Sequence, residues 1–489
     1  MLCEKKQNTK CWKPFIYFLL MSNLLVSCQN EPEVRITGSI RNINNGTIVY
    51  RISTDGMFNP FTTDTLHIQP DSTFTLTLPA REYERIDFIW WGKAALGSVI
   101  TKDHNIHLNI DASDKHHLSI SGLDEKVIKL TQLLNQLDAD VLDLRTRQGD
   151  RWQIAKDTVA TSVSHRLKAY ADSLEAQLDG LDESLQTKAR QDIRMQLLLA
   201  FQNQTMATCY RASEATKKSW FAELDKMTDF CKINHPDSPF SPAFHDVASN
   251  EAGIRYFMRG EKLPDTIKQD YPNVLFYSYE HTLTGKAQEA AMALLFLEDQ
   301  SREKFSPEIQ LLNERFFELY PESSWRTLVQ AAVAKNKAFN QITLSEDIHF
   351  LDATNVKTLK EITDLYKGKV IFMDIWATWC GPCRESFAFV KPLQDYAKEK
   401  DIVLLYLSID RPEDEEKWKK MAVLYDLKGE HIRVQEAFNQ EIYGTFGNNG
   451  ALYIPHYVII DKEGKIRYKT AASPEKMDEL RKQLDDAGK

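Results

Sequence analysis

The sequence predicts a multidomain chain in which an all-β, sandwich-like domain and an α-helical middle region precede a C-terminal α/β domain. Two observations lead to this prediction. The hydrophobic period is two residues over 34–122, becomes helical over 123–341, and mixes strands with helices over 342–489. In addition, 489 residues exceed what one ordinary hydrophobic core accommodates. The formal charge of −9, without a run of lysine and arginine, argues against a nucleic-acid partner.

Residues 1–27 are expected to be an export signal rather than part of a folded domain. Four lysines precede the apolar run 15–26, which is too short for a comfortable membrane span. The run ends in Leu25-Val26-Ser27-Cys28, which resembles a bacterial lipobox. The resemblance implies that Cys28 is lipidated, that residues 28–33 are a tether, and that acyl chains hold the protein on a membrane. The alternative is an ordinary secretory signal with an incidental cysteine.

Short alternating segments predict the β-sandwich-like domain over 34–122. The expected strands cover 34–40, 47–52, 64–69, 74–78 and 105–110, with turns at Asn44-Asn45-Gly46 and Pro70-Asp71-Ser72. The Trp90-Trp91 pair is expected to pack into the core rather than to bind a ligand. No metal site is predicted, because no carboxylate or cysteine stands at ligand spacing around the histidines of this domain. These histidines are His104, His107, His116 and His117.

Apolar residues at spacings of three and four predict helices over 123–341. One stripe runs from Leu130 to Leu144 and another from Val159 to Leu181, with a break at Gln148-Gly149-Asp150. Nothing here has catalytic spacing, so the region is expected to be a spacer or to bind a partner. A helical hairpin turning near 213–217 would place Cys209 and Cys231 roughly 15 Å apart along the helix axis. Two buried free thiols are therefore favoured over a disulfide.

The last unit, 342–489, combines strands and helices in the order of an α/β domain with a mixed sheet. Strands are expected at 349–351, 370–375, 402–409, 457–460 and 465–468. One helix is expected to start at Cys380 and to run through Arg384 to about Lys400, with a kink at Pro392. Others are expected at 412–425 and from Ser473-Pro474 onward.

Trp376-Ala377-Thr378-Trp379-Cys380-Gly381-Pro382-Cys383 is the motif that carries chemistry in this unit. Cys380 is expected at a helix start, where unpaired N–H groups and the helix dipole stabilise a thiolate. A thiolate attacks disulfides, and Cys383 is placed to resolve the mixed disulfide that forms. A structural zinc site is disfavoured because no second Cys/His pair lies nearby.

Residues 345–489 resemble the thioredoxin superfamily, and within it the TlpA/ResA-like thiol–disulfide oxidoreductases of bacterial envelopes. The motif matches that family's active-site signature nearly letter for letter. The long gap between Ile409 and Ile454-Pro455 fits the extra helix and strand of this branch. Residues 34–122 are similar to a β-rich domain of unassigned function that precedes such modules, through Gly38-Ser39-Ile40 and Asp71-Ser72-Thr73-Phe74.

The resemblance implies a role for each matching residue. Cys380 is the attacking thiol and Cys383 the resolving one, joined in a redox disulfide. Asp374 is the buried acid that takes the proton of Cys383, and its position at the end of an apolar strand should raise its pKa. Trp379, Ile454 and Pro455 contact a substrate chain, with Pro455 in the cis form.

Three positions near the motif depart from the usual pattern of that branch. Ser386 and Ala388 stand where its members usually have glutamate and proline, which leaves proton handling to Asp374 and water. His456 stands where threonine is common. One hypothesis is that its protonated imidazole lowers the thiol pKa of Cys380; the alternative is a solvent-facing side chain.

The sequence therefore predicts a periplasm-facing lipoprotein of the cell envelope that reduces protein disulfides, with no cofactor beyond the cysteine pair. Reduction is the favoured direction because thioredoxin, which shares the Gly-Pro dipeptide, has a potential of about −270 mV. A reductase there needs a membrane electron donor. The alternatives are a disulfide oxidase or isomerase, and a binding lipoprotein whose N-terminal domains carry the main role. The choice between inner and outer membrane stays open.

Overall fold

The computed structural model describes most of the chain after residue 32. The described residues are 33–42, 48–80, 83–90, 94–100, 105–111, 118–146, 159–352, 356–448 and 451–489. Several predictions fall outside them, namely those on residues 1–27, Cys28, the turn at Asn44-Asn45-Gly46, Trp91, His104, His116, His117 and Gln148-Gly149-Asp150. None of the described helices is long and apolar enough to cross a bilayer.

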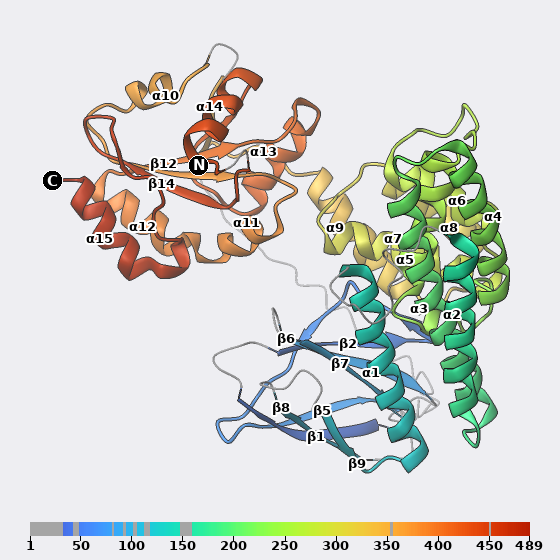
Figure 1. Ribbon diagram of the computed structural model, residues 1–489. Helices are drawn as coiled ribbons and strands as arrows, with labels where there is room; N and C mark the ends of the chain where they lie inside the picture. Colours follow the sequence, from blue (N-terminus) through green and yellow to red (C-terminus); the bar gives the residue numbers. More distant parts are fainter. Residues whose placement is uncertain are drawn as a thin grey trace, which may run out of the picture.

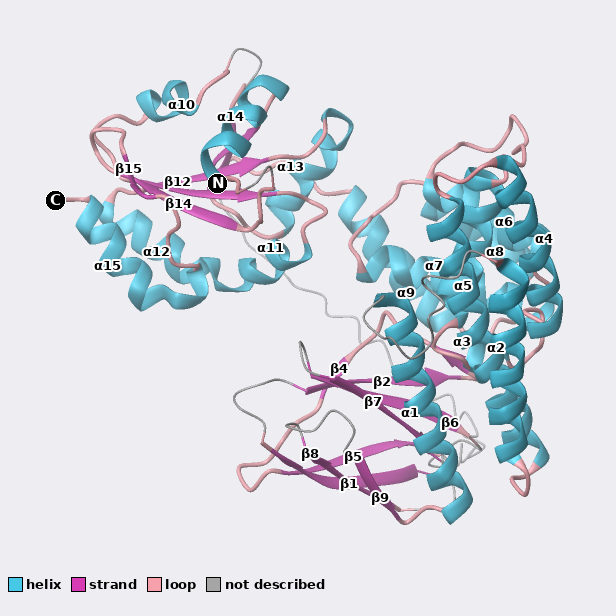
Figure 2. Cartoon of the chain, viewed as in Figure 1, coloured by secondary structure: helices cyan, strands magenta, loops and turns pink. Residues whose placement is uncertain are grey.

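The N-terminal region consists of two β-sheets in separate layers, as Figure 2 shows. One sheet has the strand order β5-β1-β8-β9, and the other has the order β3-β2-β6-β7 with β4 paired to β2. The strands are β1 Glu33–Arg41, β2 Ile48–Thr54, β3 Met57–Phe58, β4 Asp64–Thr65, β5 Thr73–Pro79, β6 Glu84–Trp90, β7 Ala94–Ile100, β8 Ile106–Asp111 and β9 Leu118–Ser121. Side chains such as Ile36, Phe74 and Phe88 fill the core of this region. The predicted all-β class is confirmed.

Four strands, β3, β6, β7 and β9, were not predicted, and the expected strand 64–69 is a strand only over Asp64–Thr65. The sequence of β6 is Glu-Arg-Ile-Asp-Phe-Ile-Trp, in which charged residues obscure the alternation of a buried strand. One of these charged residues, Arg85, is buried. Its charge is neutralised by carboxylates of the helical region, which form ion pairs with it. His107 lies on the exposed face of β8.

The middle region is a set of packed helices, as predicted (Figure 1). They are α1 Glu125–Thr146, α2 Ala160–Glu175, α3 Glu183–Cys209, α4 Glu214–Cys231, α5 Phe244–Gly253, α6 Tyr271–Thr282, α7 Gly285–Ser301, α8 Ile309–Leu319 and α9 Arg326–Asn340. Helices α3 and α4 form the expected hairpin. Cys209 and Cys231 are both buried and free, which confirms the prediction of two thiols.

The C-terminal domain has a six-stranded mixed sheet with the order β10-β13-β12-β11-β14-β15. The first four strands are parallel, whereas β14 runs antiparallel to β11, and β15 antiparallel to β14. The strands are β10 Ile348–Phe350, β11 Ile371–Trp376, β12 Val403–Ser408, β13 Gly429–Arg433, β14 His456–Ile460 and β15 Ile466–Tyr468. The helices are α10 Leu359–Leu365, α11 Gly381–Ser386, α12 Val390–Lys400, α13 Glu415–Leu424, α14 Glu436–Phe446 and α15 Met477–Ala487.

The helix predicted from Cys380 to about Lys400 is interrupted, but not where expected. The break is a 3₁₀ turn at Phe387–Phe389, upstream of Pro392. Pro392 is the third residue of α12, where its missing N–H would have no partner within the helix. The kink prediction was therefore wrong in its position.

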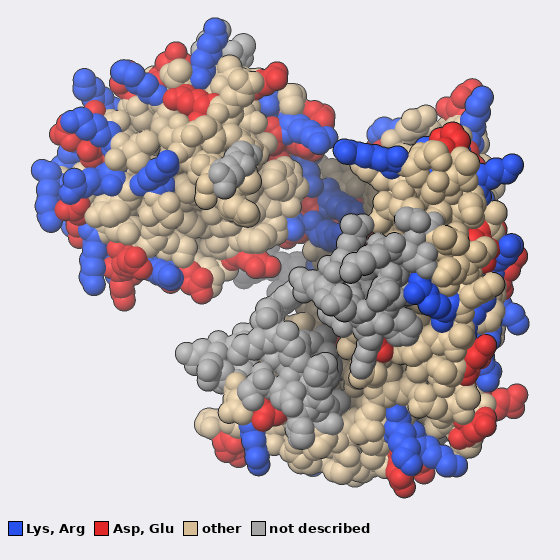
Figure 3. Space-filling view, viewed as in Figure 1, with Lys and Arg blue, Asp and Glu red and all other residues tan. Residues whose placement is uncertain are grey.

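The C-terminal domain forms its own lobe, and α9 leads into it from the helical region (Figure 1). On the face shown in Figure 3, acidic and basic side chains are interspersed over both lobes. Phe305, from the loop between α7 and α8, and Phe339 of α9 pack into the core of the C-terminal domain. The helical region thus supplies part of that core.

Candidate active site

The site lies at the junction between a buried strand and a helix. All six residues of β11 are buried, and the chain turns after Trp376 to begin α11 at Gly381. Cys380 is the N-cap of α11, and Pro382 occupies one of its first positions, where a proline costs no helical hydrogen bond. The apolar strand therefore fixes the first cysteine at the positive end of a helix.

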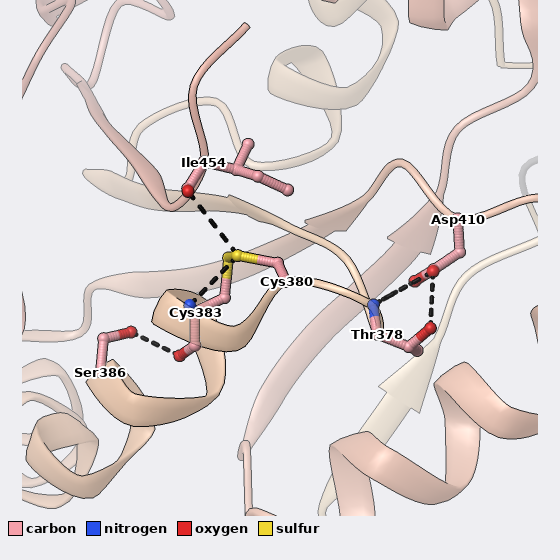
Figure 4. Close-up of a disulfide and its surroundings, with 6 residues drawn as sticks. All are labelled: Thr378, Cys380, Cys383, Ser386, Asp410 and Ile454. Atoms are coloured by element: carbon pink, nitrogen blue, oxygen red, sulfur yellow. Dashed lines mark hydrogen bonds between the residues drawn. A yellow bond between two sulfur atoms is a disulfide. The ribbon is translucent and has the colours of Figure 1, made fainter. Parts of the chain in front are cut away.

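Cys380 and Cys383 are joined by a disulfide in the structure. The Sγ atom of Cys380 accepts the backbone N–H of Cys383 at 3.1 Å and lies 3.6 Å from the carbonyl oxygen of Ile454 (Figure 4). A disulfide sulfur carries no proton, so the second distance is a contact rather than a hydrogen bond. After reduction, the same N–H group would stabilise a thiolate on Cys380.

Asp410 holds the loop that precedes Cys380. Its carboxylate accepts the backbone N–H of Thr378 at 2.9 Å and the Thr378 hydroxyl at 2.8 Å (Figure 4). The hydroxyl of Ser408 donates to the same carboxylate at 2.8 Å. Burial raises the pKa of Asp410, although these donors oppose the shift. Sequence reasoning missed this residue; the signal was a Ser-x-Asp step at the end of β12, which pairs with β11.

Asp374 lies in the middle of the sheet, between Tyr406 of β12 and Tyr457 of β14. It is 3% exposed, and its Oδ1 atom has no hydrogen-bond partner among the described residues. Burial raises the pKa of Asp374 to about 8. The upward direction is what its position in the sequence predicts, and a carboxyl with this pKa can exchange protons with a thiol near neutral pH.

The segment opposite Cys380 contains a cis peptide bond between Ile454 and Pro455. Two large aromatic side chains flank this region of the surface: Trp379 is 60% exposed and Tyr453 is 81% exposed. Trp379 was predicted to contact substrate. Tyr453 was not, because a tyrosine within an irregular segment carries no periodic signal of its exposure.

His456 and Ser386 have partners that limit their roles. The Nε2 atom of His456 lies 2.9 Å from the carbonyl oxygen of Lys469, and burial lowers the pKa of its imidazole. A neutral ring that faces Lys469 gives no support to the hypothesis that His456 acts as a cation beside Cys380. The Ser386 hydroxyl donates to the carbonyl of Cys383 at 2.7 Å (Figure 4). Cys28, the predicted lipidation site, lies outside the described residues.

The comparisons with known proteins concern this C-terminal part. The Redoxin family model matches residues 333–484. This part of the chain is a redoxin domain related to the ResA/TlpA thiol–disulfide oxidoreductases, as the motif predicted, and the region before it is unassigned.

The curated relatives include ResA proteins of Bacillus species. The chain is 31% identical over 121 residues to the thiol-disulfide oxidoreductase ResA of Bacillus thuringiensis subsp. konkukian, covering 24% of this chain and 65% of that protein. It is 34% identical over 106 residues to ResA of Bacillus anthracis, covering 22% of this chain and 56% of that protein. The chain thus spans less than two thirds of the length of these relatives.

Solved structures match the same part. One is a thiol:disulfide interchange protein from Bacteroides sp., with 23% identity and a TM-score of 0.22; the match covers 25% of this chain and 78% of that one. Another is the thioredoxin domain of a thiol-disulfide oxidoreductase from Bacteroides vulgatus, with 23% identity and a TM-score of 0.22; it covers 25% of this chain and 81% of that one.

Proposed function

We propose that the protein is a thiol–disulfide oxidoreductase that reduces disulfides of other proteins through Cys380 and Cys383. The observation that carries this proposal is the bonded cysteine pair at the start of α11, with the cis Ile454-Pro455 segment directly against the first sulfur. The relationship to ResA proteins supports the same reaction class.

The reaction begins with the pair in its dithiol form. The Cys380 thiolate attacks one sulfur of a client disulfide, so that a mixed disulfide forms and one client thiolate leaves. Cys383 then loses its proton to Asp374 and attacks the Cys380 sulfur. The bond to the client breaks, the second client thiolate takes up a proton, and the enzyme is left with the disulfide seen in the structure. Two electrons pass from enzyme to client.

Exposed groups around the cysteine pair favour a polypeptide client. The first sulfur lies against the backbone of Ile454, where a client chain can pair through its own backbone beside Pro455. Trp379, next to Cys380, and Tyr453, next to Ile454, are both exposed. Large aromatic residues of this kind are enriched where proteins bind one another.

We place this activity on the outer side of a bacterial membrane. The support is the basic stretch before residue 15, the apolar run 15–26 and the lipobox-like end at Cys28. Because disulfides persist in such compartments, a reductase there requires a membrane electron donor to restore the Cys380 and Cys383 thiols.

Trapping of the mixed disulfide tests the proposed function. In Cys383→Ser the attacking thiol of Cys380 remains, but no second thiol is present to break the mixed disulfide. A disulfide-containing protein such as oxidised insulin should therefore stay covalently linked to Cys380. Cys380→Ser is the matched control and should trap nothing. Equal trapping by both variants, or none by Cys383→Ser together with no insulin reduction by the wild type, would refute the proposal.

A further inference from the structure

A short loop of the helical region contacts the active-site helix. This loop, residues 302–306, connects α7 to α8. It meets Arg384, the residue that follows Cys383. The Nη1 atom of Arg384 donates to the Glu303 carboxylate at 2.7 Å and to the carbonyl oxygen of Arg302 at 2.8 Å. Tyr425 of the C-terminal domain also donates its hydroxyl to Glu303.

The paired guanidinium lies directly beside the cysteine turn. A Cβ atom placed on Gly381 would lie 3.9 Å from Nη2 of Arg384, so the charge rests against the residue that follows Cys380. Only 15% of the Arg384 side chain and 28% of the Glu303 side chain are exposed, which reduces the screening of their charges by water. A cation near Cys380 favours its thiolate, and the Glu303 carboxylate opposes that effect.

The position of Glu303 is built into the helical region. Glu303 and Phe305 both have left-handed backbone conformations, with φ of 51° and 49°. Residues other than glycine adopt this conformation at a cost in conformational energy. Asp299 compensates this cost by accepting the N–H of Ser306 at 2.9 Å. Asn336 of α9 donates at 2.9 Å to both Asp299 and the carbonyl of Ser306. Residues of two helices therefore fix the loop.

Phe305 anchors the loop on the other side. Its ring stacks on Phe339 with 4.0 Å between the ring centroids, and both rings belong to the core of the C-terminal domain. The loop is thus held by the helical region and buried against the redoxin domain. Glu303 meets Arg384 as part of a packed interface rather than as an isolated surface pair.

We propose that Glu303 is a positioning residue for the cysteine pair: it holds Arg384 against the Cys-Gly-Pro-Cys turn and offsets its charge. By this contact the helical region sets the redox properties of a site in another domain. The inference rests on the proposed function and gives the helical region a role in it. Another charged group near Arg384 is Lys417, on which the charges of Arg384, Asp299, Asp410 and Asp414 act through space.

The sign of the effect follows from the charges. Glu303→Gln keeps the length and one acceptor oxygen of the side chain but leaves the Arg384 charge without its counter-charge. The Cys380 thiolate is then stabilised, so its measured pKa falls, and the dithiol form gains stability over the disulfide. Arg384→Met leaves the Glu303 carboxylate alone and should shift both quantities the other way. The double variant should lie between the two.

The test uses the full chain and two readouts. The pH dependence of Cys380 alkylation by iodoacetamide gives the thiol pKa, and equilibration with glutathione gives the redox constant. For Glu303→Gln we expect a pKa fall of about half a unit to one unit and a roughly three- to tenfold shift toward the dithiol. Lys420→Met is the control, because it removes another contact between the domains, the 2.9 Å bond from Lys420 to the carbonyl of Asn340. It should change neither readout.

Two results would overturn the inference. One is an unchanged Cys380 pKa in Glu303→Gln, and the other is an equal shift in Lys420→Met, which would indicate general loosening of the interface. Failure of the proposed function is distinguishable from both. In that case the wild type would not exchange disulfides with insulin, whereas the alkylation profile of Cys380 would still report whether Glu303 acts on it.

Discussion

Burial dominates the chemistry of Asp374. Its pKa of about 8 exceeds the ordinary value of 3.8, so the carboxyl keeps its proton in the folded protein at pH values where the unfolded chain has lost it. Below about pH 4 the carboxyl is protonated in both states and does not lower the free energy of unfolding. As the pH rises from 4 toward 8, the free energy of unfolding falls. At pH 7 the loss reaches about 4 kcal/mol, at 1.4 kcal/mol for each pH unit.

Asp374→Asn should remove both the loss of folding stability at neutral pH and the group that accepts the proton of Cys383. We expect the variant to unfold at a higher temperature than the wild type at pH 7 to 8, with the difference vanishing near pH 4. Resolution of the mixed disulfide should slow by roughly 10²-fold, as for the loss of a general base. Thermal unfolding across pH and stopped-flow exchange measure the two effects. Asp478→Asn, at a carboxylate that is 97% exposed, is the control and should change neither.

Residues inside the motif were predictable, and residues that act on it from a distance were not. Cys380, Cys383 and Asp374 belong to one continuous stretch whose spacing carries the chemistry. Asp410 and Glu303 reach the same site from other segments, because β12 pairs with β11 and the loop 302–306 packs on α11. Such contacts depend on the packing of elements far apart in the chain, so a local pattern such as the Ser-x-Asp step before Asp410 can indicate the residue but not its partner.

Among the elements, the α3–α4 hairpin shows how far periodicity reaches. The turn that joins the two helices ends at Ser213, the N-cap of α4, whose side chain accepts the N–H of Thr216. The helix spacing then separates Cys209 from Cys231 as the sequence predicts, and both stay free. Periodicity failed at β6, where the charge of Arg85 obscures the strand, and at the 3₁₀ turn Phe387–Phe389, which has no breaking residue.

The two free thiols should be inert in the folded protein. Burial raises the pKa of Cys231 to about 12 and also raises the pKa of Cys209, so neither forms a thiolate at pH 8. In a chain that begins at Gln29, with the active-site disulfide oxidised, we expect no reaction with a thiol reagent under native conditions and two reactive thiols in denaturant. Rapid native labelling of either cysteine would contradict this assignment.

At the scale of the whole molecule, Arg85 joins the β region to the helices. Its guanidinium bonds to Asp87 of the same strand at 3.0 Å, to Asp192 of α3 at 2.7 Å, and to Asp138 of α1. Only 2% of Arg85 is exposed. Burial raises the pKa of Asp138 to about 6 despite the nearby cation. The cluster therefore depends on Arg85 to neutralise carboxylates that are already costly to ionise.

Arg85→Met should destabilise the protein by roughly 3–5 kcal/mol at pH 8, because it leaves the buried carboxylate of Asp192 without its counter-charge. The difference from the wild type should narrow below pH 6, as Asp138 takes up a proton. Thermal unfolding measures the difference in stability, and limited proteolysis shows whether the β region is the part that opens. Arg35→Met, on an exposed position of β1, serves as the control. A loss no greater than that of Arg35→Met would show that the cluster does not secure this junction.

The order of three regions was predictable from changes in hydrophobic period, but the joints between them were not. Arg85 and Glu303 each stand in stretches where a charged residue would ordinarily face water, and only the packed regions give them partners. One of these contacts between regions, that of Glu303 with Arg384, also lies beside the cysteine pair and is therefore the basis of the further inference.

The reduction potential of the Cys380–Cys383 pair tests the central claim most directly. It is measured by equilibrating the protein with glutathione or thioredoxin and trapping the free thiols. A reductase of the proposed kind should have a potential close to that of thioredoxin, about −270 mV. A value near −120 mV, at the oxidising end of this protein class, or a pair that does not exchange at all, would contradict the account.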